Sequence, residues 1–243
     1  LSSATDNHLG YMERDGVRSE DSFASFEEIL KIAKAKDVDF IVLGGDLFHE
    51  NKPSRKCLHT SMTLLRQYCM GDKPCRIEFL SDQSENFPDR FATVNYQDPN
   101  LNIAIPIFSI HGNHDEPSGP GGLAALDILS AAGLVNYFGQ QENLENVEIK
   151  PLLMRKGSSF LALYGLGNIR DDRLNRTFEN KKVTMFRPSE KTDSWFNMLV
   201  LHQNRIAHSV KNYLPTEYLE NVGNFLDICI WGHEHECKIG MLI

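Results

Sequence analysis

The stretch FIVLGGDLFHENKPSR, residues 40–55, contains the pattern that decides the fold. Four apolar residues with a preference for β-structure (40–43) end in two glycines and the carboxylate of Asp46. Apolar runs at residues 107–110, 198–201 and 228–231 lead in the same way into Asn113, His202 and His233. Because α/β folds place their sites at the carboxyl ends of buried strands, this repeated pattern predicts strands that end at one polar site.

The residues that follow these runs are donors suited to metal ions. Together with the cluster at residues 6–8 they comprise two carboxylates, one amide and four imidazoles: Asp6, His8, Asp46, Asn113, His202, His233 and His235. Carboxylate, amide and imidazole groups without cysteine favour a pair of hard-to-borderline divalent cations. Residues two apart on an extended segment share a face, which places Asp6 beside His8 and His233 beside His235.

Asp46 is the natural bridging ligand, because its carboxylate has two oxygens and can serve two ions. We therefore expect the first ion to be bound by Asp6, His8, Asp46 and His235. The second ion is expected to be bound by Asp46, Asn113, His202 and His233. Two ions about 3.5–4 Å apart can activate a water and clamp the attacking and leaving oxygens of a phosphoryl transfer.

Three neighbouring residues are candidates for direct roles in such chemistry. His114, adjacent to a predicted ligand, is placed to protonate the leaving oxygen. Asp115 could hold the His114 imidazole in orientation, as carboxylates beside metal sites do. His49, three residues beyond Asp46, either stabilises the phosphate or is a surface histidine at the start of a helix. The remaining histidines are predicted to be structural or surface residues: His59, His111 and His208.

Composition narrows the class of protein. The chain has 243 residues and is 41% hydrophobic, so it can bury a core. We expect no membrane association and no secretion, because no apolar run approaches the ~20 residues of a membrane helix and no signal-peptide pattern opens the chain. Five cysteines without a C-x-x-C pair predict reduced thiols in an intracellular protein. The net charge of −8 argues against a polyanionic partner, although two divalent cations would offset half of it and Lys52, Arg55 and Lys56 form a local basic segment.

Helical and strand patterns alternate along the chain, which is typical of an α/β fold. Apolar residues at helical spacing predict a helix around residues 23–33, and Pro53 fits the first turn of a second helix that runs to about residue 69. That second helix carries one apolar stripe, formed by Leu58, Met62, Leu65 and Cys69. A third helix is expected at residues 123–132, and further strands near residues 160–164, 195–201 and 226–231.

Residues 76–102 are mostly polar and aromatic and include several turn-forming residues. This irregular segment is longer than an ordinary connection between two secondary-structure elements. Such an irregular insertion is either a lid or partner-binding loop, or a disordered surface insertion. The sequence leaves both readings open.

The motifs D-x-H, G-D, G-N-H-D, a solitary H and G-H-x-H occur here in the order that resembles the calcineurin-like metallophosphoesterases. The longer segments around these motifs, at residues 44–55, 110–115, 201–205 and 231–237, resemble one branch of the metallophosphoesterases more closely. That branch is the meiotic-recombination-eleven/SbcD family, the nuclease of the double-strand-break repair complex, in its eukaryotic type. The resemblance extends from about residue 4 to residue 239, nearly the whole chain.

This resemblance implies a fold and a function. The fold is α/β, a sandwich of two mixed β-sheets flanked by helices. The implied activity is that of a DNA endonuclease and 3′-to-5′ exonuclease that uses two Mn²⁺ ions (Mg²⁺ or other divalent ions being possible), with His114 as the catalytic histidine. The implied setting is the nucleus, in DNA double-strand-break repair and meiosis.

The resemblance also implies partners. These are DNA, a second copy of the chain, a coiled-coil SMC-like ATPase and a nibrin-type subunit. The homodimer contact is expected at the apolar stripe of residues 58–69, with help from residues 123–129, and nibrin binding is expected to involve residues 76–102.

Two departures from the family pattern stand at the ends of the chain. The strand expected before Asp6 is reduced to residues 1–5, which are short and polar. The chain also stops soon after His235, where the family adds more strands and then a capping domain. We therefore expect residues 1–243 to form a metallophosphoesterase (nuclease) domain that is truncated at the C-terminus, with the capping domain absent.

Two other functions compete with a DNA nuclease. A phosphomonoesterase or protein phosphatase of the same fold is one, although protein phosphatases carry an acidic-Arg-Gly turn after Gly-Asp and a G-N-H-E, which residues 47–50 and 113–115 do not match. A non-catalytic scaffold that has lost its metals is the other. No ligand position is missing here, which argues against a scaffold.

Overall fold

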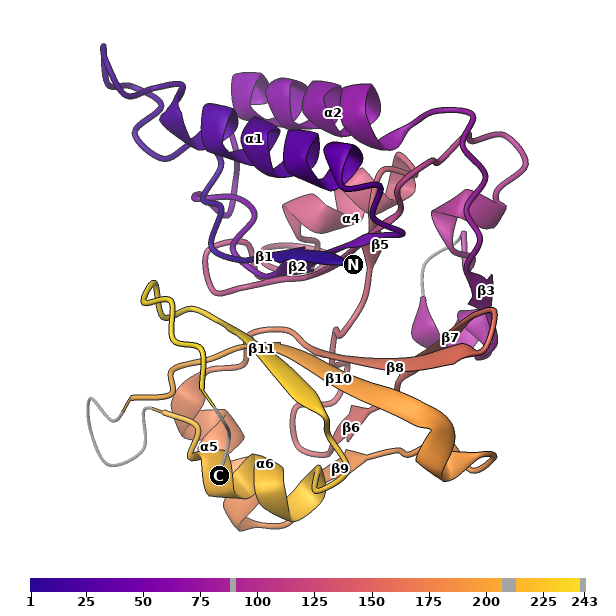
Figure 1. Ribbon diagram of the computed structural model, residues 1–243. Coiled ribbons are helices and arrows are strands. Elements are labelled where there is room, and N and C mark those ends of the chain that lie inside the picture. Colours follow the sequence, from indigo (N-terminus) through magenta and orange to yellow (C-terminus); the bar gives the residue numbers. More distant parts are fainter. Residues whose placement is uncertain (88–90, 207–212, 241–243) are drawn as a thin grey trace.

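The computed structural model describes residues 1–87, 91–206 and 213–240. Two β-sheets are stacked, and helices cover the outer side of each, as Figure 1 shows. Among the described residues the first sheet has four strands, all parallel, in the order β1 (Ser2–Ala4), β2 (Ile41–Gly44), β4 (Ile107–Ile110) and β5 (Asn136–Tyr137). The strand before Asp6 is therefore present, with three residues.

The second sheet is mixed. Its described strands follow the order β11 (Ile228–Gly232), β10 (Trp195–His202), β8 (Ser159–Leu166), β7 (Leu152–Lys156) and β3 (Glu78–Phe79). β10 is parallel to both β11 and β8, whereas β7 is antiparallel to both β8 and β3. A separate parallel pair, β6 (Val147–Ile149) and β9 (Val183–Met185), completes this half of the molecule.

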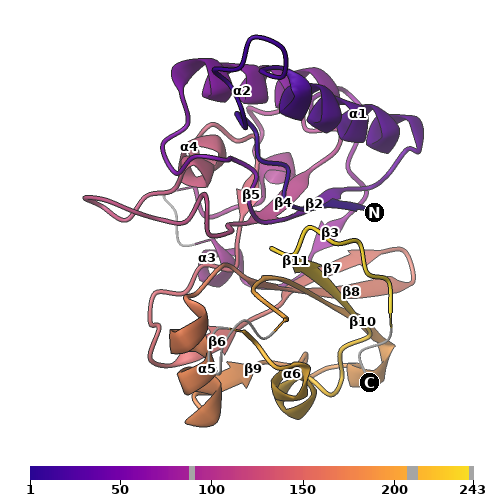
Figure 2. The same ribbon diagram turned by 90° about the vertical axis from the view of Figure 1, so that its left-hand side faces the viewer.

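Two groups of helices enclose the sheets. On the first sheet lie α1 (Asp21–Ala35), α2 (Arg55–Cys69) and α4 (Ala125–Ala131), and on the second lie α5 (Asp171–Glu179) and α6 (Thr216–Val222) (Figure 2). The apolar spacing that predicted the first helix is confirmed, because Phe23, Phe26 and Leu30 are buried. The start predicted for the second helix is wrong: Ser54 is the N-cap and accepts a bond from the Cys57 N–H at 3.0 Å, so Pro53 lies outside the helix.

Alternation along the strands divides the apolar side chains among three cores. In β2, Ile41 and Leu43 pack against α1 and α2, while Val42 faces the second sheet. In β10, Leu199 and Leu201 pack toward α5 and α6, while Met198 and Val200 face the first sheet. The layers are therefore helix, sheet, sheet, helix, and the α/β sandwich flanked by helices is confirmed. None of the helices in the described ranges is long and apolar enough to cross a membrane.

The described part of residues 76–102 is packed onto this sandwich. It contains β3, a short helix α3 (Gln83–Asn86) and a 3-10 turn η1 (Asn95–Gln97). Elsewhere in the chain, a second 3-10 turn, η2 (Thr192–Ser194), precedes β10. Ile77, Phe87 and Val94 are buried in the core between the sheets. A disordered surface insertion is therefore wrong for the described residues, because these side chains anchor the segment at the edge of the second sheet.

Candidate metal centre

The predicted ligands lie where the two sheets meet, at the carboxyl ends of five strands. Asp6 follows β1, Asp46 follows β2 and Asn113 follows β4, while His202 ends β10 and His233 directly follows β11. The two sheets are joined at this edge, because the Nδ1–H of His202 donates to the carbonyl of Gly44 at 2.8 Å. Parallel pairing within each sheet keeps the strand ends level, which brings all seven side chains into one region.

One group of donors contains Asp6, His8 and His235, whose ligand atoms lie within 4.8 Å of one another. The Nε2 atoms of His8 and His235 are 3.2 Å apart, and His235 Nε2 is 3.5 Å from Asp6 Oδ1. Asp46 Oδ2 lies 3.8 Å from His8 Nε2. These are the four side chains that we predicted for the first ion, and their imidazole nitrogens converge on the two carboxylates.

A second group contains Asp46, His202 and His233, again with ligand atoms within 4.8 Å. His202 Nε2 lies 3.2 Å from Asp46 Oδ2 and 3.3 Å from Asn113 Oδ1. Asn113 Oδ1 is also 2.7 Å from His233 Nδ1. These are the four side chains predicted for the second ion. Because Asp46 Oδ2 borders both groups, it is positioned as the shared oxygen.

Glycine explains how closely the strand ends approach each other. Gly45 has φ +94°, and a Cβ at this position would collide with the His202 ring. A Cβ at Gly112 would collide with the carboxylate of Asp46. Only residues without a side chain fit between the ligands, which is the physical reason for the G-G-D and G-N-H-D text of the sequence.

The backbone at the ligands is unusual. Asp6, His8, Asp46 and His233 have φ of 54°, 47°, 49° and 89°, and they are four of the eight non-glycine residues with positive φ in the described ranges. Such conformations are costly for side chains with a Cβ, and they cluster at functional sites. Here they are held by backbone bonds between the first two strand ends, from Asp6 N to Gly45 O at 3.1 Å and from His8 N to Asp46 O at 2.9 Å.

The electrostatics of the site favour cation binding. Burial lowers the pKa of His8 to about 4, so its imidazole is neutral and its lone pair is free near pH 7. Burial also lowers the pKa of His233, as does the neighbouring His202. Burial opposes charge on His202 as well, but the hydrogen bond and charge of Asp46 raise its pKa overall. A divalent cation would replace the proton that His202 Nε2 shares with Asp46, since metal binding releases protons from its ligands.

His114 lies at the mouth of this site. Its ring is half-buried, and its Nδ1–H donates to the carbonyl of His49 at 2.7 Å, while Nε2 has no hydrogen bond to any residue in the described ranges. Its backbone N–H donates to Asp46 Oδ1 at 2.8 Å. The ring lies edge-on to His8 with centroids 4.8 Å apart. His114 is therefore fixed beside both donor groups, with one ring nitrogen available to a substrate.

The role predicted for Asp115 is wrong. This carboxylate is fully buried and accepts bonds from the backbone N–H groups of Gly112 at 2.7 Å and Phe48 at 3.2 Å, and burial raises its pKa to about 6. The carbonyl of His49, and not Asp115, orients the His114 imidazole. Asp115 instead ties the loop after β4 to the loop after β2 through these two bonds. Its side chain and that of His114 point in different directions, because the two residues are consecutive.

His49 belongs to the site and not to a helix start. Its Nδ1 lies 3.3 Å from His8 Nδ1, and its ring stacks on His114 with centroids 5.0 Å apart and an interplanar angle of 23°. The ring of Tyr11 lies edge-on to it at 4.9 Å. Because α2 begins six residues later, at Arg55, a surface histidine at a helix start does not describe this residue.

The other histidines of the described residues belong to neither donor group, and one residue near the site escaped prediction. His59 is exposed on α2, His111 is buried, and His208 lies outside the described residues. Asn168 was not predicted, yet its side chain donates to the carbonyl of His202 at 3.0 Å. The signal was available, since an apolar run, a glycine and a polar residue also follow one another at the end of β8.

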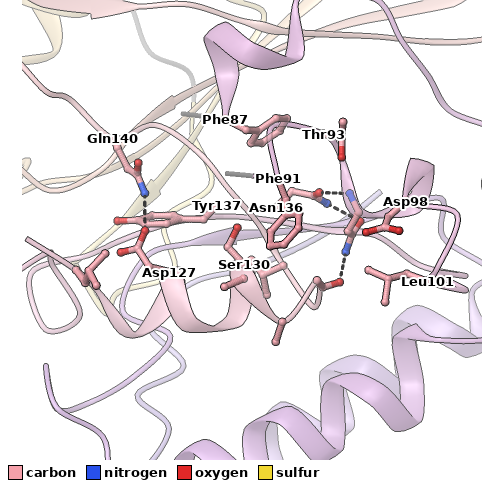
Figure 3. Close-up of a pocket in the computed structure, with 16 residues that line it drawn as sticks. Phe87, Phe91, Thr93, Asp98, Leu101, Asp127, Ser130, Asn136, Tyr137 and Gln140 are labelled. Carbon is pink, nitrogen blue, oxygen red and sulfur yellow. Dashed lines mark hydrogen bonds between the residues drawn. The ribbon is translucent and has the colours of Figure 1, made fainter. Parts of the chain in front are cut away.

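A separate cavity of about 330 Å³ lies between α4, β5, residue 87 and residues 91–101 (Figure 3). Tyr137, Asn136 and Ser130 are among its lining residues, and Gln140 donates to Asp127 at 3.5 Å across one end. None of the predicted ligands or catalytic residues lines this cavity. This cavity is therefore separate from the donor groups at the edge where the two sheets meet.

Comparison with known proteins agrees with this geometry. The family model of the calcineurin-like phosphoesterases matches residues 4–237, and the chain belongs to this family. It is thus of the phosphoesterase class, whose fold uses divalent metal ions, and the carboxylate, amide and imidazole donors described above fit such ions in their chemistry.

The curated relatives narrow this class. The chain is 60% identical to double-strand break repair protein MRE11 of Homo sapiens over 97% of its length and to that of Mus musculus over 98%. It is 55% identical to double-strand break repair protein mus-23 of Neurospora crassa over 97% of its length. The aligned part is 33%, 33% and 32% of these relatives, so the chain spans about a third of their length. The resemblance to the eukaryotic meiotic-recombination-eleven family is confirmed.

Proposed function

We propose that this chain is the nuclease part of a DNA double-strand-break repair protein, a metal-dependent endonuclease and 3′-to-5′ exonuclease that hydrolyses phosphodiester bonds. The observation that carries the proposal is the pair of donor groups that share Asp46 Oδ2, with the free Nε2 of His114 beside them. The relatives, which are double-strand break repair proteins, support the repair setting.

Each group of donors would hold one divalent ion. Asp6, His8, Asp46 and His235 would bind the first, and Asp46, Asn113, His202 and His233 the second. Two Mn²⁺ ions are proposed, and Mg²⁺ or other divalent ions also suit carboxylate, amide and imidazole donors. When bound, such ions lower the pKa of water and stabilise charge on the phosphate.

The chain's own residues would complete the reaction. In its doubly protonated form, His114 would donate the proton on Nε2 to the leaving 3′ or 5′ oxygen, while its Nδ1–H stays bound to the His49 carbonyl and holds the ring in place. His49, stacked on His114, would donate from its ring to a phosphate oxygen. Asp115 would keep the two loops that carry these histidines together, through its bonds to Gly112 and Phe48.

Partners would engage surfaces away from the metal centre. A homodimer would form through α2 and α4, where Leu58 and Met62 are only half-buried and Ile128 is 50% exposed. DNA, a coiled-coil SMC-like ATPase and a nibrin-type subunit are the further partners, the last at residues 76–102. The proposed location is the nucleus, and the proposed processes are double-strand-break repair and meiosis.

The test is digestion of end-labelled duplex and single-stranded DNA by the full-length protein, with and without Mn²⁺, and with the product ends identified. We expect Mn²⁺-dependent shortening from 3′ ends and internal cuts in single strands. The Asp46→Ala variant, purified identically, is the control for contaminating nucleases. Hydrolysis of nitrophenyl phosphate without cleavage of DNA would instead identify a phosphomonoesterase, and no hydrolysis of either substrate would identify a scaffold.

A further inference from the structure

We propose that Asn168 is a positioning residue of the metal centre, one that holds the backbone of His202 and thereby sets the affinity of the ion bound by Asp46, His202 and His233. This inference rests on the proposed function only in requiring that the centre bind divalent ions. Nothing in the family motifs quoted above contains Asn168, which lies on the loop after β8.

Asn168 makes three bonds that join three strand ends. Its side-chain Nδ2 donates to the carbonyl of His202 at 3.0 Å. Its backbone N–H donates to the carbonyl of His111 at 3.1 Å, and its own carbonyl accepts a bond from His111 Nε2 at 3.2 Å. Because His111 follows β4 of the first sheet and His202 ends β10 of the second, one residue links both sheets behind the metal ligands.

These bonds are part of a longer chain of hydrogen bonds. His111 Nε2 donates to Asn168, so its Nδ1 accepts from the hydroxyl of Tyr137 at 2.7 Å. Beyond His202, the Nδ1–H of that ring donates to the carbonyl of Gly44 at 2.8 Å. The chain runs from β5 to β2 through the ligand His202 and fixes the ring so that Nε2 faces Asp46.

Close packing fixes the other groups in this chain of hydrogen bonds more tightly than it fixes the Asn168 side-chain amide. A Cβ at Gly167 would collide with the His111 ring, so the backbone before Asn168 lies directly on that ring. His111 and Tyr137 are buried, and His202 is 0% exposed, so water does not replace their bonds easily. The half-buried Asn168 side chain supplies a bond from this rigid unit to the backbone of the predicted ligand His202.

Groups that orient metal ligands typically change metal affinity or activity by 10–100-fold when they are removed. We expect an effect of that size from Asn168→Asp in the full-length protein. This variant keeps the shape of the side chain and both backbone bonds, but places an oxygen where a donor faces the His202 carbonyl. Asn168→Ala removes the side chain altogether and should act in the same direction.

Asn175→Asp is the matched control. Asn175 lies on α5 in the same half of the molecule, and its Nδ2 also donates to a backbone carbonyl, that of Tyr213, at 3.2 Å. It is buried, and its side-chain hydrogen bond goes to a residue that is not a predicted ligand. The two Asn→Asp changes therefore remove the same kind of bond, and only one of them is expected to reach the metal centre.

Two measurements decide the matter. In a titration of each protein with Mn²⁺, followed by electron paramagnetic resonance of the free ion, the dissociation constant of one of the two ions should rise about 10–100-fold in Asn168→Asp, and neither should change in Asn175→Asp. Nuclear magnetic resonance of the metal-free proteins should show the Nδ1–H of His202 broadened or lost in Asn168→Asp alone.

Unchanged Mn²⁺ affinity together with an unchanged His202 signal in both Asn168 variants would overturn the proposal. A loss of affinity matched by Asn175→Asp would also overturn it, because the effect would then be one of general stability. Neither readout uses DNA, so absence of nuclease activity in the unaltered protein would count against the proposed function without deciding the role of Asn168.

Discussion

The two halves of the sandwich contribute different chemistry to the metal centre. The first sheet supplies every oxygen donor, from Asp6, Asp46 and Asn113, and places them on tight turns. The second sheet supplies only imidazoles, which range from fully buried His202 to His235, whose side chain is 66% exposed. Neither half holds a complete set for either ion. The seven side chains therefore come together only when the sheets dock, and binding of divalent ions would also stabilise the contact between the two halves.

The largest expected effect follows from the oxygen that both donor groups share. Asp46→Ala should weaken both ions and reduce nuclease activity to background, because Asp46 Oδ2 lies against His8 in one group and His202 in the other. Elemental analysis of the full-length protein after Mn²⁺ loading checks this. Asp37→Ala, a change in a carboxylate with a 79% exposed side chain, is the control. One ion or none in the unaltered protein would refute the two-ion assignment.

Substitution of His114 tests whether this residue, from the first half of the sandwich, acts on the substrate without being a metal ligand. As the general acid it is expected to contribute about 10²–10⁴-fold, so His114→Asn should lower nuclease activity by that factor with both ions retained. Asn113→Ala and His233→Ala, one from each half, should each lose one ion, because these two side chains contact one another at 2.7 Å.

A nitrophenyl phosphodiester provides the control for the His114 prediction, since its leaving group needs no proton. The His114 variant should hydrolyse it nearly normally, whereas the Asn113 and His233 variants should not. If His114→Asn loses metal as badly as Asn113→Ala, then His114 is a ligand, and His49 becomes the first candidate for the acid.

Removal of metal tests whether ions hold the two halves together. A ligand at 100 times its dissociation constant stabilises the folded state by about 2.7 kcal/mol per site. Chelation of the Mn²⁺-loaded protein should therefore lower its free energy of unfolding by roughly that amount or more, as measured by denaturant titration. Asp46→Ala should show no such dependence on Mn²⁺. Equal stability of the unaltered protein with and without Mn²⁺ would contradict the idea that ion binding stabilises the contact between the two halves.

The imidazoles of the second half should differ in how much each contributes to the free energy of unfolding of the metal-free protein. His202→Ala removes the buried bonds of the His202 ring to the Gly44 carbonyl and to Asp46 Oδ2, which should cost about 1–3 kcal/mol of unfolding free energy. His235→Ala removes an exposed side chain and should stay within about 0.5 kcal/mol. Denaturant unfolding in the presence of chelator separates the two. Equal effects would show that burial does not distinguish these ligands.

The smallest effect on chemistry is expected on the outer face of the first half. Leu58→Glu or Met62→Glu should give folded monomers, because these side chains are only partly buried beside α1. Light scattering and circular dichroism measure the two properties. Leu65→Glu is the contrast, because Leu65 is 0% exposed and its substitution should unfold the chain. Unfolded or still dimeric Leu58 and Met62 variants would place the interface elsewhere.

Much of this arrangement follows from the sequence. The apolar runs before Asp46, Asn113, His202 and His233 predicted strands whose ends carry ligands, and β2, β4, β10 and β11 lie at these positions. The period of two in those runs also decides which side chains face helices and which face the other sheet. These features are local, because strand preference and alternation depend on residues close together in the chain.

Other features were decided by contacts distant in the chain. Asp115 turns toward Phe48, which is 67 positions away, and leaves the orientation of His114 to the carbonyl of His49. His49 joins His8 across 41 positions, and Asn168 reaches the carbonyl of His202 across 34. No local pattern encodes the direction of a polar side chain after a strand ends, since several turns are sterically open to it.

The sequence by itself therefore determined the α/β layers, the order of the ligand clusters and the kinds of donor atom. The tertiary structure alone decided which imidazole is buried, which carbonyl orients each ring, and that positive φ is held at Asp6, His8 and Asp46. The physical reason is that hydrogen bonds between the ends of different strands stabilise those turns. They exist only after the two sheets have come together.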